Sequence, residues 1–362
     1  MAPGPETRPL LGSLLAVLSA LAAGSLFLVA TGQAPFDAFR ILGDRGFSSF
    51  GATETAIKSA PLLLISAGLL VALRAGVWNI GIDGQVLVGA LVAGASGGLL
   101  FDYLPQALML FIAVVAGAIG GMLWTVIPAM LKIRFGLNEI ITTIMMNFVA
   151  IYLTSWLVKG PLQDPAVVPP QTVLIPRDLR LWDLPGTRIH SGLLLGLGAV
   201  LFIASLFRLT SLGMRLWVVG QNPAAARHAG LRVGQLTAIA FLTSGALAGL
   251  AGANDVLGVK GMFQGEWNPA YGFTAFAVVF LARSRPLLVI PFAMFLAFMA
   301  VGADFMPRAA GIPTSFVELL EGFMLIGLAL AIAFERGNAR MPWLYRRWSG
   351  GPASQTPVEE RR

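Results

Sequence analysis

Long apolar runs alternate with short polar segments along almost the whole chain. The first run is too long for a signal-peptide core, which holds about 7 to 15 apolar residues. The runs of the length and apolarity that a membrane-spanning helix needs cover residues 9–35, 59–73, 86–100, 105–131, 137–158, 191–206, 236–259, 269–282, 287–302 and 315–334. We therefore expect an all-α integral membrane protein with about ten transmembrane helices.

Composition agrees with this pattern. The chain has 362 residues, of which 56% are hydrophobic and 12% charged, whereas a soluble domain is about 25% charged. It has no cysteine and two histidines, His190 and His228, so a disulfide framework or a metal centre is improbable. We expect no cofactor.

The basic residues set the expected orientation. Lys and Arg total 25 against 18 acidic residues, but they cluster in short segments between apolar runs. This is the positive-inside pattern of a membrane protein rather than a nucleic-acid-binding face. With both termini in the cytoplasm, sixteen of the 25 basic residues fall inside and nine outside, which favours the N-in, C-in topology.

The runs also divide the chain. We predict an N-terminal transmembrane helix at 1–35, a membrane domain at 36–335 and a basic cytoplasmic tail at 336–362. Residues 36–58 are mixed in polarity and form either an interfacial segment or a plain loop. The outer loop at 159–190 is expected to be ordered, because Trp182 and several aliphatic residues are available for packing.

The two shortest runs, 86–100 and 269–282, are the best candidates for broken or re-entrant spans. Each follows a Trp-Asn pair, Trp78-Asn79 and Trp267-Asn268. Interrupted segments in corresponding halves are typical of transporters built from repeats, although this match alone does not establish a repeat.

A polar stretch at 73–85 separates two membrane-grade runs and carries Asn79, Asp83 and Gln85. Polar or irregular backbone at membrane depth must be buried in protein or line a water-filled cavity, so a transport pathway is one hypothesis. The alternatives are structural. Asp83 can pair with Arg74 or cap a neighbouring helix, and the two amides can satisfy broken-helix backbone.

Residues 137–158 begin with a second polar group. Asn138 and Glu139 suit a helix cap or a gate, since negative charge is favourable at a helix N-terminus. Thr142 and Asn147 lie on overlapping faces and either hold helices together or line the pathway. Further along, Glu318 and Glu321 share a helix face, which should contact protein or water.

The cytoplasmic connection at 208–235 has strong helix punctuation. Asn222 is a good N-cap, Pro223 suits the first helical position and Gly230 can take the left-handed C-terminal conformation. We predict a short helix of about seven residues, roughly 10 Å long. It either packs on this chain's own helix ends or docks into another subunit.

Five stretches together resemble one family. They are WNIGIDGQ at 78–85, GLNEIITTIMMN at 136–147, the loop 213–230, SGALAGLAG at 244–252 and YGFTA at 271–275. They are similar to motifs of the branched-chain amino acid, ribose and nucleoside permeases of bacterial ABC importers, above all the larger nucleoside or simple-sugar permease. Asp83 stands where the family usually has Glu, and Trp78 where Phe is common.

The resemblance implies a dimer of permeases in the bacterial inner membrane, often of two different ones. Two ATP-binding domains would lie below it, and an extracytoplasmic binding protein would supply the substrate. The chain itself has no phosphate-binding Gly-x-x-x-x-Gly-Lys-Ser/Thr loop, so we expect no enzymatic activity in it. The implied substrate is a nucleoside, or next a simple sugar.

The predicted functional residues form two sets. The substrate-pathway set is Asn79, Asp83, Gln85, Asn138, Glu139, Thr142, Asn147 and Phe273. The ATPase-coupling set is Gly213, Arg215, Gly220, Asn222, Pro223, Ala226, Arg227 and Gly230. The alternative function is an ion-coupled secondary carrier for a polar solute that uses Asp83, Glu139, Asp255 or Glu318.

Overall fold

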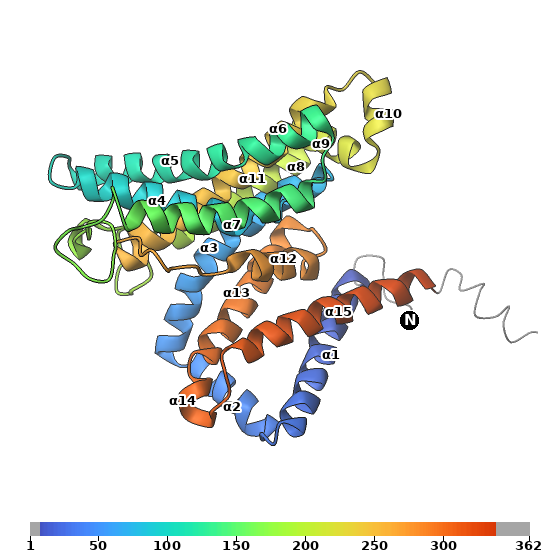
Figure 1. Ribbon diagram of the computed structural model, residues 1–362. Helices are drawn as coiled ribbons and strands as arrows, with labels where there is room; N and C mark the ends of the chain where they lie inside the picture. The colour runs from blue at the N-terminus through green and yellow to red at the C-terminus, as the bar shows by residue number, and fades with distance from the viewer. Residues whose placement is uncertain (1–7, 338–362) are drawn as a thin grey trace, which may run out of the picture.

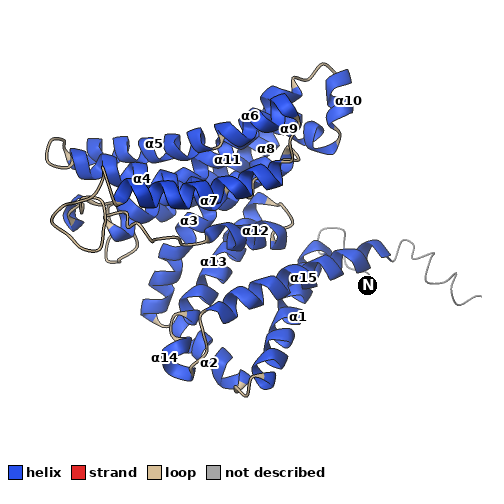
Figure 2. Cartoon of the chain, in the orientation of Figure 1, coloured by secondary structure: helices blue, strands red, loops and turns tan. Residues whose placement is uncertain are grey.

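The computed structural model describes residues 8–337, and in this range the chain is helical with no β-strand (Figure 2). The predicted tail at 336–362 therefore lies, beyond Gly337, outside the described residues. The helices are α1 (Arg8–Ala30), α2 (Pro35–Gly46), α3 (Ser49–Arg74), α4 (Ile82–Leu100), α5 (Gln106–Trp124), α6 (Val126–Phe135), α7 (Glu139–Val158), α8 (Gly192–Leu209), α9 (Ser211–Gln221), α10 (Pro223–His228), α11 (Val233–Asp255), α12 (Tyr271–Leu281), α13 (Pro286–Ala303), α14 (Met306–Ala310) and α15 (Ser315–Gly337).

The expected multi-pass membrane architecture is confirmed. In the described range, nine segments are long and apolar enough to cross a membrane, and the tenth predicted run forms the shorter apolar helix α12. Helix α3 is almost entirely buried, whereas only 22% of the α7 span is buried inside the structure. Helix α3 is therefore the centre of the bundle.

Helix α3 packs on α8, α11, α12 and α13, and the helices form two groups (Figure 1). Helices α4, α5, α7 and α11 run side by side in one group, and α1 packs along α15 in the other. Helix α12 lies between the groups and contacts α3, α13 and α15. The outer loop and α10 lie at opposite ends of the molecule, as the predicted topology requires.

Three boundaries differ from the sequence expectation. Helix α3 begins at Ser49, ten residues before the predicted start, because the Ser48 side chain caps it by accepting from the Gly51 N–H. The predicted span at 105–131 is divided at Thr125 into α5 and α6. Pro128 explains this division, since its ring clashes with the carbonyl four residues earlier.

The third difference concerns the run at 86–100, which we expected to be broken. Helix α4 is continuous from Ile82 to Leu100, and the irregular backbone lies before it. The other run that we expected to be broken, 269–282, does form a short helix. This helix, α12, has 11 residues and follows a long non-helical segment.

The outer loop packs through its aliphatic residues, as predicted, but not through Trp182. Ile175 and Leu181 are buried in a cluster with Met109 and Ala93. Trp182 is 54% exposed, and its indole N–H donates to the Gln106 side-chain oxygen at 3.3 Å.

Candidate functional site

The connection from α3 to α4 is the core of the candidate site. Helix α3 ends with Gly76 in the left-handed conformation (φ 73°), and the Val77 N–H donates to the Ala72 carbonyl at 2.9 Å. The following segment runs beside α12 in the opposite direction. The Trp78 ring lies 6.0 Å from that of Phe280 near the end of α12, while Asp83 reaches its beginning. Polar backbone thus lies beside a membrane helix.

Asn79 and Gln85 bind each other. The Asn79 Nδ2 donates to Gln85 Oε1 at 3.0 Å, and the Gln85 Nε2 donates to Asn79 Oδ1 at 2.8 Å. The Asn79 amide also donates to the Ser244 hydroxyl on α11 at 2.9 Å. Both amides are essentially buried. This geometry matches the structural alternative, in which the amides hold the interrupted backbone.

Helix α7 holds the same segment from the other side. Asn147 accepts from the Gly84 N–H at 2.8 Å and donates to the Ile80 carbonyl at 3.0 Å. The Thr143 hydroxyl accepts from the Ile80 N–H at 3.2 Å. The Thr142 hydroxyl instead donates within its own helix, to the Asn138 and Glu139 carbonyls.

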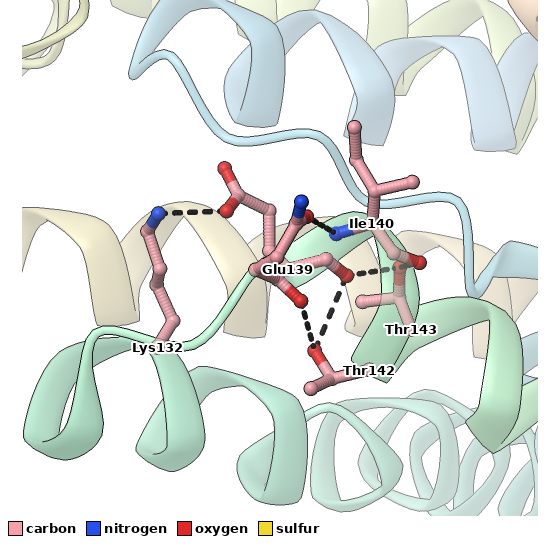
Figure 3. Close-up of polar contacts among 6 residues, drawn as sticks. Lys132, Glu139, Ile140, Thr142 and Thr143 are labelled. Carbon is pink, nitrogen blue, oxygen red and sulfur yellow. Dashed lines mark hydrogen bonds and ion pairs between the residues drawn. The ribbon is translucent and has the colours of Figure 1, made fainter.

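The beginning of α7 is a capped helix end (Figure 3). The Asn138 side chain accepts from the Ile140 N–H at 2.9 Å. Glu139 forms an ion pair with Lys132 at the end of α6, with 2.7 Å between Oε2 and Nζ. The predicted capping role of Asn138 is therefore confirmed, and the Lys132–Glu139 pair fastens α6 to α7.

Three carboxylates from three helices hold the beginning of α12. Asp83 of α4 accepts from the Gly272 N–H at 2.8 Å. The Tyr271 hydroxyl donates to Asp255 of α11 at 2.6 Å, and the Thr274 hydroxyl donates to Glu321 of α15 at 2.9 Å. Of the two structural alternatives for Asp83, the structure has the cap of a neighbouring helix.

The segment that precedes α12, residues 261–270, was marked in the sequence only by the Trp267-Asn268 pair at its end. Glu266, Asn268, Ala270 and Phe273 are exposed, and the residues between them are less so. Ala270 has φ 51°, which is uncommon for a residue other than glycine. The glycines and the mixed polar and apolar residues of this segment are those of an ordinary connecting loop.

The predicted cytoplasmic helix is confirmed as α10. Asn222 Oδ1 accepts from the Ala224 and Ala225 N–H groups at 3.0 Å each, and Gly230 has φ 80°. Ala226 is the buried residue of α10. Arg227, like Arg215 on α9, is exposed. One face of α10 therefore rests on its own chain and the rest is open.

A cavity of about 760 Å³ lies between α10 and the α3–α4 connection. Its wall includes Gly76 and Val77 on one side and the basic residues Lys132, Arg227 and Arg232 on the other. The cytoplasmic helix and the interrupted membrane segment thus border one space.

The outer end of the molecule has a smaller cavity of about 300 Å³, which His190 lines. His190 is buried, its Nδ1 accepts from the Gly192 N–H at 3.2 Å, and its ring packs on Gly258. Burial lowers the pKa of His190 from the ordinary 6.5, and the charge of Asp183 opposes that shift.

Comparison with known proteins identifies the family. Residues 51–329 match the family described as the permease component of branched-chain amino acid transport systems. The chain belongs to this permease family. The glucose ABC transporter permease protein TsgB13 of Haloferax volcanii is 33% identical over 96% of this chain and 94% of its own length. The guanosine ABC transporter permease protein NupP of Bacillus subtilis is 31% identical over 91% and 97%.

A third relative, the nucleoside ABC transporter permease protein NupB of Lactococcus lactis, is 27% identical over 91% of this permease and 93% of its own length. The protein is therefore a multi-pass permease subunit of an ABC importer, as predicted, rather than a stand-alone carrier. Of the four carboxylates that the carrier alternative named, Asp83, Glu139 and Asp255 each have a structural partner, and Glu318 is exposed.

Proposed function

We propose that this permease works with separate ATP-binding subunits, a second permease subunit and an extracytoplasmic binding protein to import a neutral, polar molecule. A nucleoside is the first candidate and a simple sugar the second. The substrates in the names of the relatives, guanosine, nucleosides and glucose, support both candidates. Two Bacillus subtilis relatives, NupP and NupQ, both carry the name of a guanosine permease, which supports pairing of two permeases.

The observation that carries the proposal is the capped helix α10 at the cytoplasmic end. Such a short helix is marginal in water by itself, and its Asn222 cap and buried Ala226 hold it in place. The exposed Ala224, Ala225 and Arg227 form the surface against which an ATP-binding subunit would push.

The pathway would follow the exposed face of α12 and of the segment before it. Phe273 and Trp78 are exposed, at 52% and 42%, and Asn268 adds an amide. Non-helical backbone and polar side chains at membrane depth are tolerated beside water or protein. The second permease would close this face. In this proposal, Asn79, Gln85 and Asn147 support the lining rather than bind substrate.

The test is uptake of guanosine or glucose by the reconstituted complex with Ala225 changed to Glu. Because Ala225 is exposed, this permease variant should fold and insert normally while ATP-dependent uptake is lost. Ala226 is a poorer choice, since its side chain is buried and a charged residue there would disturb the chain's own packing. Full uptake by A225E would contradict the docking role of α10.

A further inference from the structure

Helix α9 lies directly against the end of α3, backbone on backbone. A Cβ atom on Gly220 would overlap the Arg74 carbonyl oxygen and lie 3.0 Å from the Gly76 nitrogen. A Cβ atom on Gly76 would lie 3.2 Å from the Gly220 Cα. No side chain separates the two backbones at this point, so a displacement of Gly220 would displace Gly76 directly.

A second fastening holds the other end of α9. The Arg74 Nε donates to the Gly213 carbonyl at 3.3 Å, and the Arg74 guanidinium lies 4.4 Å from the centre of the Phe207 ring. Gly213 in turn packs against the Phe207 backbone. Helix α9 is thus clamped to the last turn of α3 at two points, and its buried Leu216 and Val219 lie between them.

Movement at Gly76 has a short route to the membrane interior. Asn79 follows three residues later and carries the bonds to Gln85 and Ser244. Ile80 and Gly84 carry the bonds to α7. Packed elements of this kind move together rather than deform. At its C-terminal end, α9 leads directly into α10 through Asn222, which is the C-cap of α9 and the N-cap of α10.

We propose that the Gly76–Gly220 contact and the Arg74 clamp convey the movement of α10 to the α3–α4 connection, so that Gly76, Gly220 and Arg74 are positioning residues for transport. This inference rests on the proposed docking of ATP-binding subunits at α10. It assigns transmission to α9, while α10 supplies the contact surface.

The first test compares Gly220→Ala with Gly198→Ala in the reconstituted complex. Gly198 is a matched control, because a Cβ atom there meets nothing within 4 Å. We expect G220A to keep basal ATP hydrolysis while guanosine transported per ATP falls about fivefold or more, the lower end of typical coupling between sites. G198A should leave this ratio unchanged. An unchanged ratio in an assembled G220A complex would overturn the inference.

If the G220A complex does not assemble, a second pair of variants tests the inference. Arg74→Leu and Phe207→Leu should each lower the ratio, and the double variant should be no worse than the poorer single one, because both remove the same clamp. Independent, additive losses would refute the clamp.

A conformational readout separates transmission from mere stability. The chain has no cysteine, so Trp78→Cys gives a single reporter on the α3–α4 connection. Its rate of thiol labelling should change on nucleotide trapping, and G220A should abolish that change. If the complex without substitutions shows no ATP-dependent uptake, the proposed function fails. If it transports and G220A responds normally, this inference alone fails.

Discussion

The two non-helical segments before α4 and α12 differ in how they are held. The first, residues 75–81, is bonded to α7 and α11 through Asn79 and Ile80. The second, residues 261–270, is bonded to the outer loop through Gly261 and Phe263, and only its last part is exposed, at Glu266, Asn268 and Ala270. In the function proposed above, the first segment transmits movement and the exposed end of the second lies along the pathway. Asp83 joins the first segment to the beginning of α12.

The largest expected effect tests the rigidity of the first segment. Asn147→Leu leaves the Gly84 N–H and the Ile80 carbonyl without their side-chain partner. Buried polar groups without partners cost about 1 to 3 kcal/mol, so we expect the free energy of unfolding to fall by about that amount. Thermal unfolding of the purified permease measures it. Thr142→Val, whose hydroxyl bonds within its own helix, is the control, and equal losses would contradict the assignment.

The second prediction tests the joint between the segments. Asp83→Ala removes the acceptor for the Gly272 N–H, and loss of a helix cap costs about 0.5 to 2 kcal/mol. Asp83→Asn keeps an acceptor oxygen and should cost less. Thermal unfolding and guanosine uptake by the two variants provide the comparison. Equal losses would mean that charge rather than the cap holds α12.

The third prediction tests the second segment as lining. Phe273 is 52% exposed, so Phe273→Ala should change stability little. An aromatic contact is worth about 0.5 to 1.5 kcal/mol, which corresponds to a rise of about two- to tenfold in the KM for guanosine. Phe273→Leu keeps the apolar bulk without the ring and serves as control. A large loss of stability with an unchanged KM would place Phe273 in packing instead.

The fourth prediction concerns His190, whose ring packs on Gly258 just before the second segment. Because burial lowers the pKa of His190 in the folded protein, the unfolded chain takes up the proton first. The stability that His190 contributes is complete above its ordinary pKa of 6.5 and is lost as the pH falls below that value. Thermal unfolding between pH 7.5 and about 5 should reveal the loss, and His190→Gln should reduce it. Identical pH profiles would exclude His190 as the cause.

The smallest effect is expected at Ala270, whose φ of 51° suits glycine. Ala270→Gly relieves the backbone but gives the unfolded chain more freedom, so the net gain should be about 0.5 kcal/mol. The same substitution, to glycine, at the less exposed neighbour Pro269 would instead free a φ angle that the proline ring fixes. Destabilisation by A270G would show that the methyl group itself packs.

Much of the fold was predictable because membrane helices are specified locally. The lengths of the apolar runs predicted the nine membrane-spanning segments and the apolar run that forms the short helix α12. The cap residues Asn222 and Asn138 identified the beginnings of α10 and α7. The early beginning of α3 was missed because polar residues such as Glu54 and Lys58 indicated an interfacial segment or a loop, although polar residues are acceptable at a helix end outside the apolar core.

The site was less predictable because its contacts join distant parts of the chain. Asp83 and Gly272 are 189 positions apart, and no local pattern in the sequence connects them. The close approach of Gly76 and Gly220 is equally invisible, since many of the 42 glycines lie in helices for other reasons. Family motifs identified the stretches that matter but not which residues they contact.

The shared cap at Asp83 has a thermodynamic consequence. One carboxylate belongs to α4 and stabilises α12, so the free energies of the two helix ends are linked and not additive. Linkage is reciprocal. Suppose that nucleotide binding to the ATP-binding subunits shifts α12 through α9 and α4, and thereby changes the affinity for substrate by some factor. Substrate bound against α12 must then change the affinity for nucleotide by the same factor. The ATP-binding subunits would therefore bind nucleotide differently when the pathway holds substrate.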